Sequence, residues 1–240
     1  MTDSWAGYDE YKSDSALSER YYAFVTACFE QGIRAVVGST PVTAALDVAC
    51  GSGDSTAVLA KYAEHVEAVD LSPALIAKAQ ARPELKAVEL HQGDFLEYPL
   101  ARRYDLITAA WLHNFLHNEQ DQRRALHKLA GALNEGGAVV LLFPSETFTS
   151  SRTGRYVARL TWHQAWYEHT ARFTRGVFSF RDAPWQVMTC WQPLYLFELY
   201  SKRFDLQFLD TKKLCVEGGF LDEQYLSPPF EVMYGRKRGS

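Results

Sequence analysis

Residues 46–54 read LDVACGSGD, a short apolar run that ends in two closely spaced glycines, and a helical pattern follows directly. A glycine-rich turn between a strand and a helix lets the backbone approach a ligand closely, and the first turn of the helix adds unpaired N–H donors. The stretch therefore predicts a strand, a turn and a helix that together bind something small and polar.

The spacing of these glycines separates two ligand classes. A dinucleotide turn is expected to read GxGxxG, whereas Gly51 and Gly53 are followed by Thr56 at the third position. The carboxylate of Asp54 is unfavourable beside a pyrophosphate, but it suits a cationic ligand such as a sulfonium that carries an ammonium group. About twenty residues downstream Asp70 ends the next apolar run, where a carboxylate can accept hydrogen bonds from both hydroxyls of a ribose.

Short apolar runs alternate with helical patterns between residues 43 and 144. Strands separated by helices imply crossover connections, and hence an α/β fold with a parallel sheet and helices on both faces. The predicted strands are Ala44–Val48, Val66–Val69, Ala87–Leu90, Asp105–Ala109 and Ala138–Phe143, and the predicted helices are Ser55–Tyr62, Pro73–Arg82 and Asp121–Leu133.

The segments on either side of this core have different patterns. Apolar residues at spacings of three and four, from Leu17 to Ile33, predict a helical zone that ends near residue 40. The segment after residue 145 is rich in tryptophan and arginine, with a predicted helix from Arg155 to Arg172. Two short strands are expected around Gln224–Leu226 and Phe230–Tyr234.

In their order and spacing these segments resemble the class I S-adenosylmethionine-dependent methyltransferases. DVACGSG is similar to the first motif of that family, with Ala49 where a glycine is commonest, and VEAVDLSPALIAKA, QGDFLEYPL, YDLITAAWLHN and LNEGGAVVLL are similar to the next four. The resemblance implies a Rossmann-like α/β fold with a seven-stranded, mostly parallel sheet. It implies one domain over residues 1–240, with an N-terminal helical lid (1–40), a cofactor-binding core (43–144), an aromatic-rich substrate-cover insertion after the fifth strand (145–195) and the C-terminal part of the sheet (196–240).

The resemblance also implies S-adenosyl-L-methionine as the cofactor. It places Asp47, Gly51 and Gly53 along the methionine end, Asp70 on the ribose, and Asp94 with Phe95 at the adenine. The other expected cofactor-binding residues are Ala49, Leu71, Ala110 and Trp111. Each assignment has a structural alternative, since Asp47 can be a polar strand end, Asp70 the cap region of the next helix, and the glycines turn residues.

Candidate catalytic residues follow the fourth strand, because ligands of open α/β sheets lie beyond the carboxyl ends of the strands. If a helix begins here, His113 and His117 share one face, and either imidazole can take a proton from a hydroxyl, phenol or enol. A subgroup of small-molecule C-methyltransferases resembling this chain has a catalytic histidine near the position of His117. Tyr8 and Tyr11 lie in a polar stretch that resembles the lid of the family. Alternatively, both histidines lie on a helix surface.

Composition restricts the partners. The formal net charge of −4 argues against a nucleic-acid partner, and no apolar stretch approaches the ~20 residues of a membrane-spanning helix. The first residues lack the basic and then apolar order of a secretory signal, so we expect a cytoplasmic protein that meets a small-molecule acceptor. The four cysteines include no CxxC pair, and we expect no metal. The residues make no prediction about the oligomeric state.

The first hypothesis for the function is transfer of a methyl group to an O- or C-nucleophile of a small, secondary-metabolite-like molecule. An alternative keeps the fold and the cofactor but not methyl transfer: intramolecular cyclisation of S-adenosylmethionine gives azetidine-2-carboxylate and methylthioadenosine. A nicotinamide oxidoreductase is disfavoured by Asp54 and by the missing third glycine. A scaffold without turnover is disfavoured because the acidic positions are retained.

Overall fold

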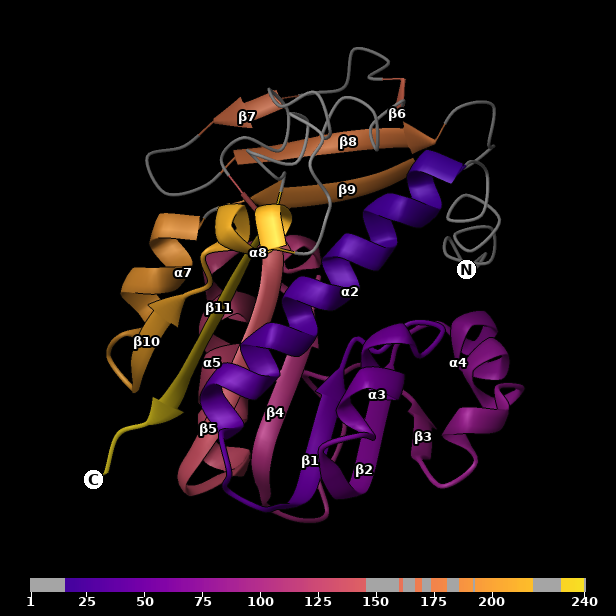
Figure 1. Ribbon diagram of the computed structural model, residues 1–240. Coiled ribbons are helices and arrows are strands. Elements are labelled where there is room, and N and C mark those ends of the chain that lie inside the picture. The colour runs from indigo at the N-terminus through magenta and orange to yellow at the C-terminus, as the bar shows by residue number, and fades with distance from the viewer. Residues whose placement is uncertain are drawn as a thin grey trace.

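The computed structural model describes residues 16–145, 160–161, 167–169, 174–180, 186–191, 193–217 and 230–239. Its centre is a seven-stranded sheet with the order β10-β11-β5-β4-β1-β2-β3 (Figure 1). The strands are β1 (Val42–Val48), β2 (Ala63–Asp70), β3 (Glu89–Gln92), β4 (Tyr104–Ala110), β5 (Leu133–Pro144), β10 (Phe204–Phe208) and β11 (Phe230–Lys237). β11 is antiparallel to β10 and β5, and the remaining pairs are parallel. The predicted seven-stranded, mostly parallel sheet is confirmed.

The strand order reverses beside β1. The chain runs from β1 to β2 and β3 on one side, and then returns to the other side of β1 to form β4 and β5. In open α/β sheets the crevice outside the carboxyl ends of the strands at such a reversal is the usual ligand site. The turns that follow β1, β2 and β4 are therefore the first place to look for function.

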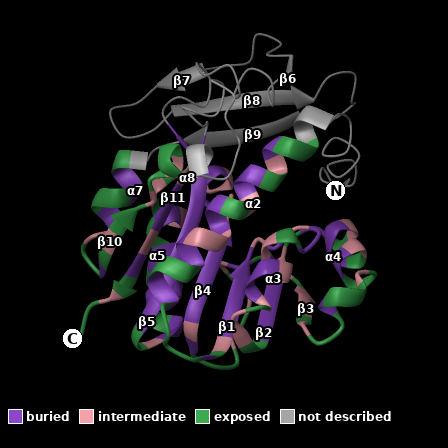
Figure 2. Ribbon diagram, viewed as in Figure 1, coloured by how far each residue is buried: buried purple, intermediate pink, exposed green. Residues whose placement is uncertain are grey.

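Helices cover both faces of the sheet (Figure 1). On one face lie α2 (Ala16–Val37), α3 (Asp54–Leu59) and α4 (Pro73–Gln80), and on the other lie α5 (Glu119–Ala132) and α7 (Pro193–Tyr200). α8 (Thr211–Glu217) lies next to α2. Successive strand residues point to opposite faces, so Ala45 packs with α2 and α3 whereas Leu46 packs with α5 and α7. Burial on both faces explains why the strands read as nearly continuous apolar runs (Figure 2).

α2 belongs to the core. Phe24, Cys28 and Ile33 are fully buried against the sheet, and a Cβ on Gly32 would approach Cγ1 of Val232 to 2.8 Å. The predicted helical zone is confirmed from residue 16 onward. Residues 16–37 form a core helix, because the sheet buries its apolar stripe, and the predicted lid role of residues 1–40 stays a prediction.

A second sheet of four strands follows β5. β8 (Thr174–Phe180) pairs with β6 (Leu160–Thr161), β7 (Tyr167–His169) and β9 (Gln186–Trp191). The predicted helix Arg155–Arg172 is wrong where the structure describes it, because residues 160–161 and 167–169 are strands. Pairing with β8 decided their conformation, whereas apolar spacing alone favoured a helix. This sheet lies beyond the carboxyl ends of β4 and β5, and β9 packs against both β5 and the turn after β4 (Figure 1).

Candidate active site

Strained backbone marks the carboxyl ends of two neighbouring strands. In the described part of the chain, Ala49 (φ 58°) and Trp111 (φ 66°) are the two residues other than glycine with a positive φ. Ala49 directly follows β1, and Trp111 directly follows β4, which pairs with β1. Such conformations are uncommon outside glycine and concentrate at functional sites, where surrounding structure holds them. Both therefore point to the same edge of the sheet.

The turn after β1 needs its two glycines for different reasons. Gly53 (φ 92°) packs tightly, because a Cβ there would lie 2.3 Å from Cδ1 of Leu85 in the short helix η1 (Pro83–Leu85). Gly51 (φ 55°) has room, since the nearest atom, Cδ1 of Leu75, is 4.0 Å from where its Cβ would lie. At Gly51 the left-handed backbone alone favours glycine, because a Cβ would meet no close atom.

Asp70, the last residue of β2, connects three turns. Its Oδ2 accepts a hydrogen bond of 2.8 Å from the backbone N–H of Gly51, and its Oδ1 accepts one of 2.8 Å from that of Ser72. Its carbonyl oxygen accepts a third from Gly93, also at 2.8 Å. An ionised carboxylate offers about four acceptor positions, which is why one side chain can serve several donors at this edge of the sheet.

An exposed apolar side chain lies beside this carboxylate. Leu71 is 62% exposed, although leucine side chains are more often buried. Its carbonyl oxygen accepts a hydrogen bond of 3.1 Å from Nε2 of Gln92, which fixes the backbone at this point. An apolar surface next to a carboxylate matches a ligand that combines a ribose with a flat base.

Asp94 and Phe95 follow β3, but their side chains do not lie together. Asp94 is exposed, and its Oδ1 accepts a hydrogen bond of 2.9 Å from the backbone of Leu96, which makes it a turn residue. Phe95 is 5% exposed and belongs to the core on the α5 side, with Nζ of Lys128 5.1 Å from the centre of its ring. The structure places this ring in the core, and the expected contact of Asp94 and Phe95 with an adenine stays a prediction.

Asp47 lies below the turn and is fully buried. Its Oδ2 accepts hydrogen bonds of 2.7 Å from the hydroxyls of Ser55 and Thr56, and its Oδ1 accepts one of 2.8 Å from Thr108. Burial raises the pKa of Asp47 to about 6, although the three hydroxyl donors oppose this shift. The carboxylate thus ties β1 to α3 and β4, and supports the turn from within.

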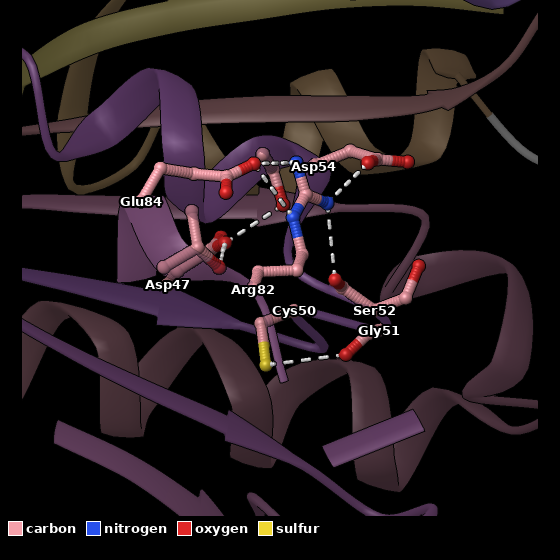
Figure 3. Close-up of polar contacts among 9 residues, drawn as sticks. Asp47, Cys50, Gly51, Ser52, Asp54, Arg82 and Glu84 are labelled. Atoms are coloured by element: carbon pink, nitrogen blue, oxygen red, sulfur yellow. Dashed lines mark hydrogen bonds and ion pairs between the residues drawn. The ribbon is translucent and has the colours of Figure 1, made fainter. Parts of the chain in front are cut away.

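Asp54 is paired inside the protein. Its Oδ1 lies 2.6 Å from Nη1 of Arg82, which also donates to the carbonyl oxygen of Ser52 at 3.1 Å (Figure 3). Nη2 of the same guanidinium lies 2.8 Å from Oε1 of Glu84. The sequence indicated Asp54 as an attractive partner for a cationic ligand. In the structure the guanidinium of Arg82 pairs with this carboxylate but also with Glu84, so two carboxylates share one positive charge, and the attraction of Asp54 for a cationic ligand stays a prediction.

His113 is also buried, with 1% of its surface exposed, and both ring nitrogens have partners. Nε2 of Gln122 donates to the carbonyl oxygens of His113 and Leu116, so its Oε1 accepts from Nδ1–H of the imidazole at 2.6 Å. Nε2 of the imidazole then accepts from the hydroxyl of Tyr200 at 2.9 Å. Burial lowers the pKa of His113 to about 4. The ring is therefore neutral, with its lone pair engaged, and unsuited to the expected role of base.

The segment after β4 is not one helix. A single 3₁₀ turn, η2 (His113–Phe115), is followed by extended backbone at Leu116, and α5 begins after its cap residue Asn118. His113 and His117 therefore do not share a helical face as predicted, because η2 ends at Phe115 and Leu116 is extended before His117. His117 is half-buried. Tyr8 and Tyr11 lie outside the described residues.

Ala110 and Trp111 are placed at the edge as expected. Ala110 ends β4 and is half-buried, and the backbone N–H of Trp111 donates to the carbonyl oxygen of Leu142 at 2.7 Å. The indole of Trp111 lies edge-on to Phe230, with 6.3 Å between ring centres. Packing against β11 thus holds the residue whose backbone is strained.

The structure adds two residues that sequence reasoning missed. Arg82 fixes the turn after β1 although it lies 28 residues from Asp54, and no local signal indicates this contact. Asn114, in η2, is 6% exposed, yet its Oδ1 has no hydrogen-bond partner among the residues that the structure describes. The described residues include no group of histidine, cysteine or acidic side chains that could hold a metal ion, and none of their helices is long and apolar enough to cross a membrane.

Comparison with known proteins agrees with this architecture. Residues 45–137 match a family model described as a methyltransferase domain. Nodulation protein S of Sinorhizobium fredii is 29% identical over 119 residues, which cover 49% of this chain and 55% of that protein. A dTDP-3-amino-3,4,6-trideoxy-α-D-glucopyranose N,N-dimethyltransferase of Streptomyces venezuelae is 30% identical over 128 residues, covering 48% and 53%. The chain thus matches about half the length of these two relatives.

A solved structure shares the fold over almost the whole chain. The N-methyltransferase NodS of Bradyrhizobium japonicum WM9, in complex with S-adenosyl-L-homocysteine, superposes with a TM-score of 0.58 at 16% identity. The superposition covers 95% of this chain and 91% of that one. Residues 45–137 are therefore similar to a methyltransferase domain, and the chain shares the fold of a solved methyltransferase structure.

Proposed function

We propose that this protein transfers a methyl group from S-adenosylmethionine to a small-molecule acceptor. The observation that carries the proposal is the bridge between Asp70 and the N–H of Gly51, at the point where the strand order reverses. The residues present fit the cofactor. Asp70 offers acceptor positions for the ribose hydroxyls, Leu71 offers an exposed apolar surface for the adenine, and the open side of Gly51 receives the methionine end.

When bound, S-adenosylmethionine supplies a methyl group already activated on a sulfonium. The protein therefore needs mainly to align the acceptor and to exclude water. Asp47 and Arg82 hold the turn after β1 from inside and from outside, so the cofactor meets a rigid surface. We assign the four-stranded sheet within residues 145–195 as the cover over the acceptor, because β9 packs on the turn that follows β4.

The acceptor side is formed by the segment from Trp111 to His117. Because His113 is buried and engaged, His117 is the remaining histidine that can receive a proton there, and we assign it that role. We keep Tyr8 and Tyr11 as proposed catalytic residues in a lid that closes over the bound cofactor. Two of the proteins compared above carry N-methyltransferase names, so nitrogen joins oxygen and carbon as a candidate acceptor atom.

This function can be tested by identifying the nucleoside products that the protein forms from S-adenosylmethionine. The purified protein is incubated with S-adenosylmethionine alone, and then with panels of amines, phenols and hydroxylated metabolites. We expect S-adenosylhomocysteine only when an acceptor is present. Methylthioadenosine formed without any acceptor would contradict methyl transfer and favour the cyclisation described above.

A further inference from the structure

Asn114 is a buried residue whose side-chain acceptor is unsatisfied. It lies in η2 and is 6% exposed, and within the described part of the chain its Oδ1 has no hydrogen-bond partner. Buried polar atoms are nearly always satisfied, because a buried acceptor that has lost its water is destabilising. By contrast, the other buried amide of this region, Gln122, uses its oxygen and its nitrogen fully. An unsatisfied amide that the fold keeps is a candidate for contact with a ligand.

The position of Asn114 fits the acceptor side. η2 begins three residues after β4 ends, and it is enclosed by the carboxyl edge of the main sheet and by β9. Side chains that follow one another in a 3₁₀ helix are about 120° apart. Since His113 points between α5 and α7 to meet Gln122 and Tyr200, the side chain of Asn114 leaves in a different direction. It does not share the satisfied core of its neighbour.

We propose that Oδ1 of Asn114 accepts a hydrogen bond from an N–H group of the acceptor, and that the acceptor of this enzyme is an amine. The inference rests on the methyltransferase function proposed above. In the transfer, the nitrogen lone pair forms a bond to the methyl carbon while the carbon–sulfur bond breaks and leaves its electron pair on sulfur. The resulting ammonium then releases one proton to solvent or to His117.

An amine suits this oxygen better than a hydroxyl does. A primary or secondary amine keeps an N–H while its lone pair attacks, so the hydrogen bond to Asn114 persists through the reaction and orients the nucleophile. A phenol or enol must lose its proton to become a strong nucleophile, and its oxyanion would then face an oxygen that repels it. Methylation of a neutral amine also needs no strong base, which agrees with the neutral, fully engaged imidazole of His113.

Stability provides a first test, which needs no acceptor. Asn114→Leu replaces the amide by an apolar side chain of similar size, and Gln122→Leu is the matched control at a satisfied amide. We expect Tm to be unchanged or raised for N114L and lowered by several degrees for Q122L. If N114L also lowers Tm by several degrees, the amide of Asn114 has structural partners and the inference is overturned.

Turnover provides the second test. The probes are D-glucosamine, glycylglycine and benzylamine, with D-glucose, glycolic acid and 4-nitrophenol as hydroxyl counterparts, and S-adenosylhomocysteine formation is measured. We expect the wild-type protein to methylate an amine, with kcat/KM at least tenfold lower in N114L and largely retained in N114D, whose carboxylate keeps the acceptor oxygen. The inference would be overturned if the wild-type protein methylated only the hydroxyl probes, or if it methylated none of the three amines. It would also be overturned if N114L methylated amines as fast as the wild-type protein does.

Calorimetry separates this inference from the proposed function. We expect wild-type protein and N114L to bind S-adenosylhomocysteine with the same Kd, because Asn114 faces the acceptor. If the wild-type protein does not bind S-adenosylhomocysteine, the methyltransferase function itself fails. If binding is intact but N114L keeps its full activity with amines, only the role of Asn114 fails.

Discussion

The backbone N–H of Gly51 donates a hydrogen bond of 2.8 Å to Oδ2 of Asp70, and so joins the turn after β1 to the end of β2. The two residues are 19 positions apart in the sequence, yet the contact sets the shape of the proposed cofactor site. A left-handed φ of 55° at Gly51 turns its N–H toward the carboxylate. Loop geometry and ligand recognition therefore depend on the same carboxyl group.

Asp70→Asn is expected to weaken binding of S-adenosylhomocysteine. Hydrogen bonds to charged groups contribute about 1.5–3 kcal/mol, so the Kd should rise roughly ten- to a hundredfold. Isothermal titration calorimetry measures the change. Asp205→Asn, at the remote strand β10, is the control and should bind normally. A Kd within about twofold of wild type for D70N would remove Asp70 from the site.

The two glycines of the turn predict different defects. Gly53→Ala should destabilise the fold by about 1–3 kcal/mol or more, because it adds a strained φ and an atom 2.3 Å from Leu85. Gly51→Ala meets no close atom and should cost about 1 kcal/mol in stability, while weakening cofactor binding. Urea unfolding and calorimetry distinguish the two effects. Equal losses of stability in both variants would contradict the packing difference.

Asp54→Asn tests whether the carboxylate of Asp54 attracts a cationic ligand to the turn after β1. The ion pair of Asp54 with Arg82 is partly exposed, so it contributes about 0–1 kcal/mol to stability. Because Arg82 already pairs with this carboxylate, we expect the Kd for S-adenosylmethionine to change by less than about threefold. A tenfold loss of affinity confined to the cationic S-adenosylmethionine, and absent for neutral S-adenosylhomocysteine, would support the electrostatic role.

The two histidines predict different kinetics. His117→Asn should lower kcat by roughly tenfold or more if its imidazole receives the proton, and should shift the acidic limb of the pH profile. His113→Gln should leave that limb in place, because the buried imidazole is not the titrating group. Steady-state rates between pH 5 and 9 provide the measurement. An acidic limb lost in H113Q and kept in H117N would reverse the assignment.

The fold was predictable from the sequence because short-range patterns decide it. The apolar runs at β1, β4 and β5 and the glycines at 51 and 53 predicted the sheet, and Asp70 was correctly placed at a strand end. The predictions that failed, and the contacts that were missed, depend on residues that are far apart in the sequence. The partner of Asp54 lies 28 residues away, and the strands at 160–161 and 167–169 exist through pairing with β8. Neither the burial of His113 nor the unsatisfied oxygen of Asn114 leaves any trace in local periodicity.

Asp47 and His113 are both buried, but their titrations act on stability in opposite directions. The pKa of Asp47 is raised from 3.8 to about 6, so its contribution to stability is present below pH 4 and is lost as the pH rises through 6. The pKa of His113 is lowered from 6.5 to about 4, so its contribution is present above pH 6.5 and is lost as the pH falls through 4. Each effect amounts to at most about 3 kcal/mol.

These opposite effects nearly cancel in the wild-type protein between pH 4 and 6.5, and single variants should reveal them. For Asp47→Asn the effect of His113 remains, so the free energy of unfolding should fall more steeply than in wild type as the pH is lowered from 7 to 4.5. For His113→Gln the effect of Asp47 remains, and the free energy of unfolding should rise relative to wild type over the same range. Urea unfolding at several pH values measures both slopes. Parallel curves for wild type and the two variants would show that neither group titrates abnormally in the folded state.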